Sequence, residues 1–159
     1  MRTPWRAMLS MATVLNQKAI VSVDYEYVNY QNANISEIED DYNGSMEQTT
    51  NQDIEDYLRA THNFRVGAEY RFNSLFSLRT GYAFWDSPYH NETHKNYNRI
   101  KAFTAGAGLN FGMFYCDAAF IHKFSENETV FYSYYDIQAE PVKNKYLSNE
   151  ARITLGIRF

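Results

Sequence analysis

The stretch SNEARITLGIRF, residues 148–159 at the carboxyl end of the sequence, decides the fold. From residue 151 onward its odd positions are apolar, and they are Ala151, Ile153, Leu155, Ile157 and Phe159. The even positions beside them are charged, polar or glycine, and they are Glu150, Arg152, Thr154, Gly156 and Arg158. Successive side chains of a β-strand point to opposite faces, so this alternation predicts a strand with one apolar and one polar face.

The same period-two alternation recurs along the chain and predicts six further strands. The seven predicted strands cover residues 4–15, 19–30, 60–72, 75–86, 99–112, 114–123 and 148–159. The mean hydropathy is -0.55, and no run of about 18 apolar residues occurs, which excludes transmembrane helices. A membrane β-strand needs only about 9–11 residues with one apolar face, so the composition is compatible with a membrane barrel.

The connections between the predicted strands alternate in length. The short ones are residues 16–18, 73–74 and 112–113, and the long ones are residues 31–59, 87–98 and 124–147. In an antiparallel sheet this order puts all short turns at one end and all long loops at the other. Outer-membrane barrels have short periplasmic turns and long outer loops. The sequence therefore predicts an all-β, antiparallel transmembrane β-barrel. A soluble β-sandwich that acts as a binding module is an alternative.

The odd number of strands has a consequence for the two ends of the chain. If the short turns face the periplasm, residues 148–159 end in the periplasm and residues 4–15 begin outside. Bacterial single-chain barrels have an even number of strands. We therefore expect missing upstream strands, so that the chain is one part of a larger barrel. Residues 129–138 alternate weakly, and we interpret them as extensions of the flanking strands beyond the bilayer. The alternative is that they form an eighth strand of a small structural or adhesive barrel that acts through its outer loops.

We expect the polar row of side chains to line the barrel lumen and the apolar row to face lipid. An outward Arg or Lys at the bilayer midplane would cost about 2–4 kcal/mol. The candidates for lining the lumen are Asp24, Glu26, Arg65, Glu69, Arg71, Arg79, Asp117 and Arg152. Aromatic side chains near strand ends suit the interfaces between lipid and water. The predicted members of these girdles are Tyr27, Tyr30, Tyr70, Tyr82, Phe84 and Phe111.

The long loops carry little recognisable chemistry. Residues 31–58 hold eight of the 19 acidic residues and no Lys or Arg, which predicts a solvated loop, with cation capture as the alternative. A short helix at residues 52–59 is indicated by the spacing of Ile54, Tyr57 and Leu58. The HNETH motif at 90–94 lies in a predicted loop, so a polar loop is expected there and not a metal site.

Composition and motifs exclude several classes of function. The net charge of -4 leaves no basic footprint for a nucleic acid. No set of nucleophile, base and acid stands out in the sequence, so we expect a protein that is not an enzyme and that needs no cofactor and no metal. The lone Cys116 lies on an apolar row, where packing is the expected role.

The ordered series of strands resembles the carboxyl-terminal half of the outer-membrane transporters for long-chain fatty acids and other hydrophobic compounds, the FadL/TodX type. The segments that carry the resemblance are TPWRAMLSMATVL (3–15), IVSVDYEYVNY (20–30), NFRVGAEYRF (63–72), LRTGYAF (78–84), AGAGLNFG (105–112) and ITLGIRF (153–159). Some relatives in this family are labelled haemin receptors. The resemblance implies a fourteen-stranded barrel in the bacterial outer membrane, with passive uptake of a hydrophobic ligand.

The resemblance also implies partners. They are the lipid bilayer, a hydrophobic small molecule such as a fatty acid, the barrel-assembly machinery and the missing amino-terminal barrel half. The apolar row Ile153, Leu155, Ile157 and Phe159 resembles the signal that the assembly machinery reads. No ligand-binding residue of the family falls on a position of this sequence, because the plug and the wall opening belong to the amino-terminal half.

Overall fold

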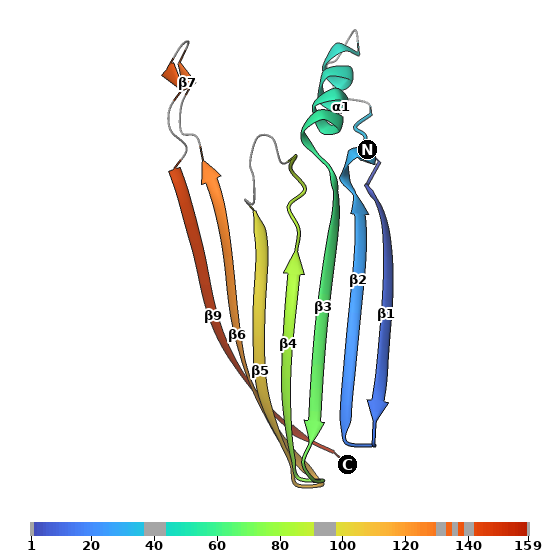
Figure 1. Ribbon diagram of the computed structural model, residues 1–159, viewed down its shortest axis with the longest axis vertical. Coiled ribbons are helices and arrows are strands. Elements are labelled where there is room, and N and C mark those ends of the chain that lie inside the picture. Colours follow the sequence, from blue (N-terminus) through green and yellow to red (C-terminus); the bar gives the residue numbers. More distant parts are fainter. Residues whose placement is uncertain are drawn as a thin grey trace.

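The computed structural model describes residues 2–36, 44–90, 98–129, 133–134, 137–138 and 142–158. Seven antiparallel strands form one sheet in the order β1-β2-β3-β4-β5-β6-β9 (Figure 1). The strands are β1 (Trp5–Leu15), β2 (Ala19–Asn29), β3 (Ala60–Arg71), β4 (Phe76–Trp85), β5 (Arg99–Asn110), β6 (Phe114–Thr129) and β9 (Val142–Ile157). The prediction of an all-β fold with seven antiparallel strands in one sheet is confirmed.

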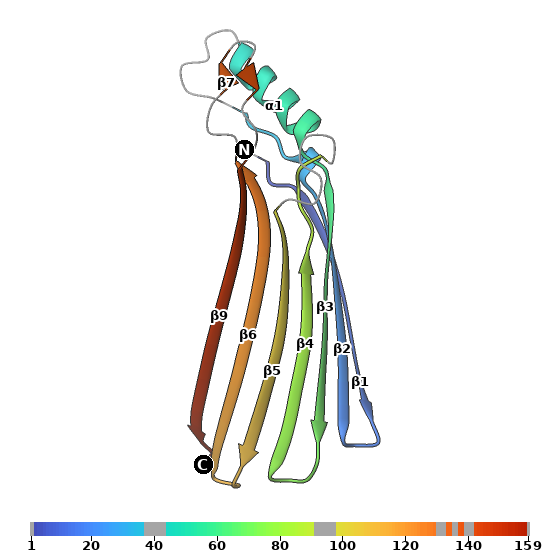
Figure 2. The same ribbon diagram turned by 60° about the vertical axis from the view of Figure 1, so that its left-hand side comes forward.

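Three tight turns lie together at the end of the sheet that we call the turn end, and the chain's last residues lie there too (Figures 1 and 2). Asn16 and Gln17 have φ angles of 48° and 57°, as the central residues of a type I′ hairpin turn require. Gly112 has φ of 84° in the turn between β5 and β6. The Asn73 side chain accepts hydrogen bonds from the backbone N–H groups of Leu75 and Phe76 at 2.9 and 2.7 Å, which closes the third turn.

The opposite end, which we call the loop end, carries the helical elements and the amino-terminal residues. The elements are η1 (Tyr30–Asn32) and α1 (Ser45–Tyr57). The predicted helix at 52–59 was wrong at both ends, since α1 ends at Tyr57 and begins at Ser45. The earlier start was missed because residues 45–51 are almost entirely polar and carry no apolar periodicity. Asn51 stabilises this part of α1 by bonding both the N–H and the C=O of Ile35, at 2.8 and 2.9 Å.

Strands β6 and β9 are longer than predicted. β6 continues to Thr129 and β9 already begins at Val142, and pairing continues from Glu126 opposite Lys145 to Thr129 opposite Val142. The predicted loop 124–147 was therefore wrong at both ends. The flanking strands do extend, but through residues 124–129 and 142–147 and not through 129–138. Period-two alternation does not mark these extensions, because beyond Phe124 most of their residues are polar and the apolar ones, Val142, Tyr146 and Leu147, follow no alternation. Residues 129–138 add no eighth strand to the sheet, since β7 (Ser133–Tyr134) and β8 (Ile137–Gln138) pair only with each other in the described part of the chain.

The register divides all seven strands into two faces, because residues opposite each other in a ladder share a face. One row across four strands reads Thr80, Ala105, Phe120 and Ala151, and the adjacent row reads Arg79, Gly106, Ala119 and Arg152. We call the first set the apolar face and the second set the polar face. Between the turn end and the level of Phe124, no strand carries an Asp, Glu, Lys or Arg on the apolar face except Lys101.

The polar face is the more enclosed one, so the sheet curves toward it. The most buried strand residues, Val28, Thr61, Ala102 and Gly108, all lie on the polar face. The apolar face is open, with Ile153 and Leu155 each 75% exposed. Among the described residues, no second sheet covers the apolar face, so the alternative of a β-sandwich does not describe the fold. No described helix is long and apolar enough to cross a membrane.

Candidate functional site

The sheet brings the charged residues of the sequence pattern onto one face. Asp24 lies opposite Arg65, and Glu69 lies opposite Arg79. When the register is followed across the sheet, all the predicted lumen-lining residues fall on the polar face. They are Asp24, Glu26, Arg65, Glu69, Arg71, Arg79, Asp117 and Arg152. Their sharing of a face follows from period-two geometry, whereas their contacts depend on register and depth.

Four of these residues form an ion-pair network near the turn end. Glu69 accepts from Arg71 Nε at 2.7 Å and from Arg79 Nε at 2.8 Å. Arg79 also reaches Asp117 with an Nη1–Oδ1 distance of 2.5 Å. The network therefore connects β3 and β4 with β6, and we call it the Arg79 network. Charge-assisted hydrogen bonds of this kind are stronger and more directional than neutral ones.

Gly108 explains how Arg79 reaches a strand that is not its neighbour. β5 lies between β4 and β6, and Gly108 lies opposite Asp117 on β6 and opposite Ser77 on β4. A Cβ atom at Gly108 would lie 2.6 Å from Asp117 Oδ1 and 3.4 Å from Arg79 Nη1. The absent side chain leaves the space that the guanidinium crosses. Glycine in a strand interior commonly marks such a close approach.

An open pocket of about 480 Å³ surrounds this network. Arg158 contributes a third guanidinium, which lies 5.6 Å from the centre of the Tyr115 ring. The Tyr115 ring in turn covers Gly156, where any Cβ atom would collide with it. The pocket thus presents cations, carboxylates and an aromatic ring on the concave side of the sheet. Such a surface favours water and polar groups over bare hydrocarbon.

Gly108→Val is expected to separate Arg79 from Asp117. In the wild-type background, a double-mutant cycle with Arg79→Gln and Asp117→Asn should give a coupling free energy of about 0.5–1 kcal/mol, because both side chains are partly exposed. In the Gly108→Val background the coupling should fall to near zero. The measurement is urea unfolding in detergent micelles. Gly67→Val is the control. If the coupling between Arg79 and Asp117 is the same in the Gly108→Val background as in the wild-type background, Arg79 does not reach Asp117 through the space above Gly108.

The other predicted residues lie outside this network. Glu26 pairs with Arg6 at 3.3 Å and accepts from Asn63 at 3.1 Å, nearer the loop end. Asp24 and Arg65 face each other in the register, yet they form no ion pair within the described part of the chain.

Arg152 pairs with Glu150 two residues earlier on the same strand, with an Nε–Oε1 distance of 2.5 Å. Both side chains are exposed, at 63% and 39%. The polar face therefore holds separate clusters instead of one continuous ladder.

Sequence reasoning missed a second ion cluster, at the loop end. The Asp86 side chain is only 9% exposed and receives Arg59 Nη2 on both oxygens at 2.9 Å. Arg99 Nε and the backbone N–H of Ser87 also donate to its Oδ1 at 2.9 Å. Asp86 and Arg99 lie at the ends of predicted strands and Arg59 lies just before one, so alternation does not pair them, and only the Asp-Ser-Pro turn signal marked this position.

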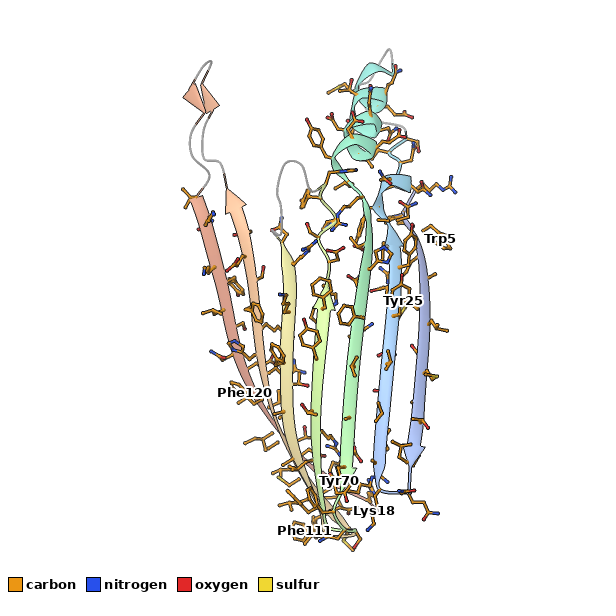
Figure 3. The ribbon with its side chains drawn as sticks, viewed as in Figure 1. Trp5, Lys18, Tyr25, Tyr70, Phe111 and Phe120 are labelled. Atoms are coloured by element: carbon orange, nitrogen blue, oxygen red, sulfur yellow. The ribbon has the colours of Figure 1, made fainter. Side chains whose placement is uncertain are left out.

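Aromatic rings touch one another across the loop end of the apolar face. The ring contacts are Trp5–Tyr27 at 5.5 Å, Tyr27–His62 at 5.4 Å, Phe64–Phe84 at 5.1 Å, Tyr82–Phe103 at 4.9 Å and Phe103–Phe124 at 6.2 Å. A second group at the turn end joins Tyr70 to Phe72 at 4.8 Å and Phe72 to Phe76 at 5.4 Å. Figure 3 shows Trp5 and Tyr25 in the upper part of the sheet and Tyr70 and Phe111 near the turns.

The distance between the two aromatic groups fits a bilayer. On β2, the apolar face from Ala19 to Tyr27 spans about 26 Å at about 3.3 Å of rise per residue. The apolar band of a membrane barrel is about 25 Å tall and has aromatic girdles at both edges. Tyr30 departs from the predicted girdle, because it lies in η1, beyond the end of β2.

The predicted assembly signal lies on the apolar face of the edge strand β9. Ile153 and Leu155 are each 75% exposed and Ile157 is 57% exposed, while Phe159 lies outside the described residues. Most of the HNETH motif also lies outside them. Within the described ranges, no group of His, Cys, Asp and Glu residues could hold a metal ion.

A curved antiparallel sheet with an exposed apolar face and a charged concave face defines a partial β-barrel. The fold is similar to the crystal structure of a Pseudomonas aeruginosa FadL homologue, with a TM-score of 0.53 and 15% sequence identity. The match covers 94% of this chain and 34% of that chain. No protein-family model and no curated protein matches the sequence. The likeness shows a FadL-like fold, and the chain is a partial all-β barrel.

Proposed function

We propose that this chain forms part of the wall of a bacterial outer-membrane barrel that admits long-chain fatty acids or other hydrophobic solutes. The observation that carries the proposal is the apolar face, which continues across all seven strands with its large side chains exposed. In water this surface would be costly, at about 25 cal/mol per Å² of apolar area. Lipid removes that cost, and the FadL-like fold supports the same orientation.

The sheet also indicates what closes the barrel. β1 and β9 both run from the loop end to the turn end (Figure 2), and their outer edges pair with no strand in the described part of the chain. Backbone groups cannot stay unsatisfied in hydrocarbon, so the sheet must be completed. To pair antiparallel with both β1 and β9, the missing part of the barrel must contribute an odd number of strands. The first and last of those strands must run from the turn end to the loop end. A second copy of the chain in the same orientation offers the wrong directions, which favours a different partner, the missing barrel half.

In this proposal the chain does no covalent chemistry. The solute's own gradient and its binding supply the energy, and the polar face keeps the lumen wet. The barrel-assembly machinery would insert the protein and read the apolar row of β9. The charged clusters of the polar face would orient water and the polar end of a solute, while hydrocarbon contacts come from the parts of the lumen that complete the barrel.

Two neighbouring alanines on β6 give a matched test of whether a solute passes through the barrel lumen. Ala119 lies on the polar face and Ala118 on the apolar face, and both are exposed. In proteoliposomes that contain the complete barrel, Ala119→Trp should slow the uptake of a fluorescent long-chain fatty acid several-fold, because the indole projects into the lumen. Ala118→Trp should leave uptake unchanged, since tryptophan is tolerated beside lipid. Uptake that is equal in empty and protein-containing vesicles would contradict the proposed function.

A further inference from the structure

Basic residues gather on the apolar face at the loop end of β5, β6 and β9. Two adjacent rows of the register cross these strands there. One row reads Lys101, Phe124 and Leu147, and the next row toward the loop end reads Arg99, Glu126 and Lys145. The first of these rows lies at the level of Phe84 and Phe124 in the aromatic group at the loop end, and the second lies one row beyond it. We call Arg99, Lys101 and Lys145 the basic cluster.

Lys101 is the centre of this cluster. Its Nζ lies 5.5 Å from the centre of the Phe124 ring, and in the described part of the chain it forms no ion pair. Lys101 lines an open pocket of about 380 Å³ together with Phe84, Arg99, Phe124 and Glu126. Lysine commonly buries its methylene stem against apolar surface while its ammonium group stays in the polar layer.

Lys145 stands on the other side of Phe124. Its Nζ is 3.3 Å from Glu126 Oε1, and its side chain is 75% exposed. β5 and β9 flank β6 at about 4.8 Å per strand, and Lys101 and Lys145 are offset by two residues along the strands, so their Cα atoms are about 12 Å apart. That width accommodates a phosphate group between two ammonium groups. Arg99 adds a third cation beside them, although Asp86 already accepts from its Nε at 2.9 Å.

Directly below the basic cluster lies exposed hydrocarbon surface. Phe103, Phe120 and Ile153 lie on the same face toward the turn end, and they are 52%, 48% and 75% exposed. Phe103 stacks on Phe124 with ring centres 6.2 Å apart, so the apolar surface reaches the cluster along β5. On β6 and β9 the row between them holds the hydrogen-bonded pair His122 and Asn149. A ligand that fits both parts has an anionic head and long acyl chains.

From this arrangement we infer that the outer wall of the barrel at β5, β6 and β9 binds a phosphate-bearing lipid of the surrounding leaflet. The Lys101 and Lys145 ammonium groups hold the phosphate, and the acyl chains lie along Phe120 and Ile153. A free anion would gain nothing from the apolar surface below, which favours the lipid as its source. The inference rests on the proposed orientation of the apolar face toward lipid, but it assigns a second ligand that is not the transported solute.

Lys123 provides a matched control. It lies on β6 only one residue from Phe124, opposite Ala102 and therefore on the polar face. The variants Lys101→Gln plus Lys145→Gln and Lys123→Gln can be compared in the complete barrel purified in a non-ionic detergent. The probes are phosphatidic acid, phosphatidylcholine as the zwitterionic lipid, and inorganic phosphate as a competitor. Native mass spectrometry gives the dissociation constant of each lipid.

We expect phosphatidic acid to bind the wild-type protein more tightly than phosphatidylcholine does, and inorganic phosphate not to displace it. The double variant should weaken phosphatidic acid binding about 30-fold, because each basic residue near a membrane surface contributes about 1 kcal/mol and about 1.4 kcal/mol is tenfold. Lys123→Gln should leave the constant within about twofold of wild type, since its charge lies on the other face.

Three results would overturn the inference: equal losses in the double variant and Lys123→Gln, equal binding of the two lipids, or displacement by inorganic phosphate, which would indicate a site for free anions. The uptake experiment with Ala119→Trp separates this from the proposed function. If uptake fails but phosphatidic acid still binds selectively, only the proposed transport function is contradicted. Normal uptake without lipid selectivity contradicts only the lipid site.

Discussion

Leu155→Arg is expected to destabilise the chain in a lipid bilayer. The loss should be smaller than the about 2–4 kcal/mol that a lipid-facing arginine costs at the midplane, because Leu155 shares its register row with Phe76 of the aromatic group at the turn end. Leu155 is 75% exposed on the apolar face of β9 and lies opposite Cys116 of β6. An arginine there must leave water without any charged partner on its face. The measurement is the free energy of reversible folding into lipid vesicles, followed by urea titration.

Thr154→Arg is the matched control, one residue away and on the polar face. Thr154 lies opposite Asp117, so an arginine there stays beside water and a carboxylate. We expect folding into vesicles close to that of the wild-type protein. If Thr154→Arg is the more damaging of the two variants, the faces of the barrel are reversed.

Asp86→Asn is expected to cost about 2–3 kcal/mol of folding free energy. The Asp86 side chain is 9% exposed, and it neutralises Arg59 and Arg99, whose side chains are 20% and 28% exposed. Removing its charge takes a shared carboxylate away from two poorly solvated guanidinium groups, and breaking a buried ion pair from one side is far more costly than losing a surface pair. The measurement is urea unfolding of the refolded protein.

Glu150→Gln serves as the reference for that experiment. Glu150 pairs with Arg152, but both side chains are well exposed, at 39% and 63%, so water replaces the lost interaction and stability should stay near that of the wild-type protein. Similar losses in the two variants would mean that the Asp86 cluster is not an organising contact of the loop end.

The strands of the sheet could be predicted because alternation of apolar and polar residues is a property of each short segment of sequence. A strand with one face in lipid and one in water must alternate, and the rows of Ile153 and Leu155 or of Val21 and Val23 show that alternation directly. The ends of β6 and β9 could not be placed, since above the apolar band neither face needs hydrophobic residues. The beginning of α1 was missed for the same reason, as its first turns carry no apolar row.

The grouping of charges on the polar face was also predictable, whereas their pairing was not. Period two places Arg79 and Asp117 on one face, but their contact depends on the register of three strands and on the missing side chain of Gly108. The Asp86 cluster joins the segments after α1, after β4 and at the start of β5, so no local pattern indicates it. Tyr27, Tyr82 and Phe84 of the aromatic group at the loop end could be predicted from their places near strand ends, while the ring-to-ring contacts required the register.

The central claim is that the apolar face of the sheet lies against lipid. A tryptophan scan of β9 tests it most directly: Trp5 and Trp85 are replaced by Phe, and a single Trp is placed in turn at positions 152, 153, 154 and 155. The barrel is then folded into vesicles whose acyl chains carry bromine, which quenches only fluorophores in contact with them. We predict strong quenching at 153 and 155 and weak quenching at 152 and 154. Strong quenching at 152 and 154, or no alternation at all, would contradict the claim.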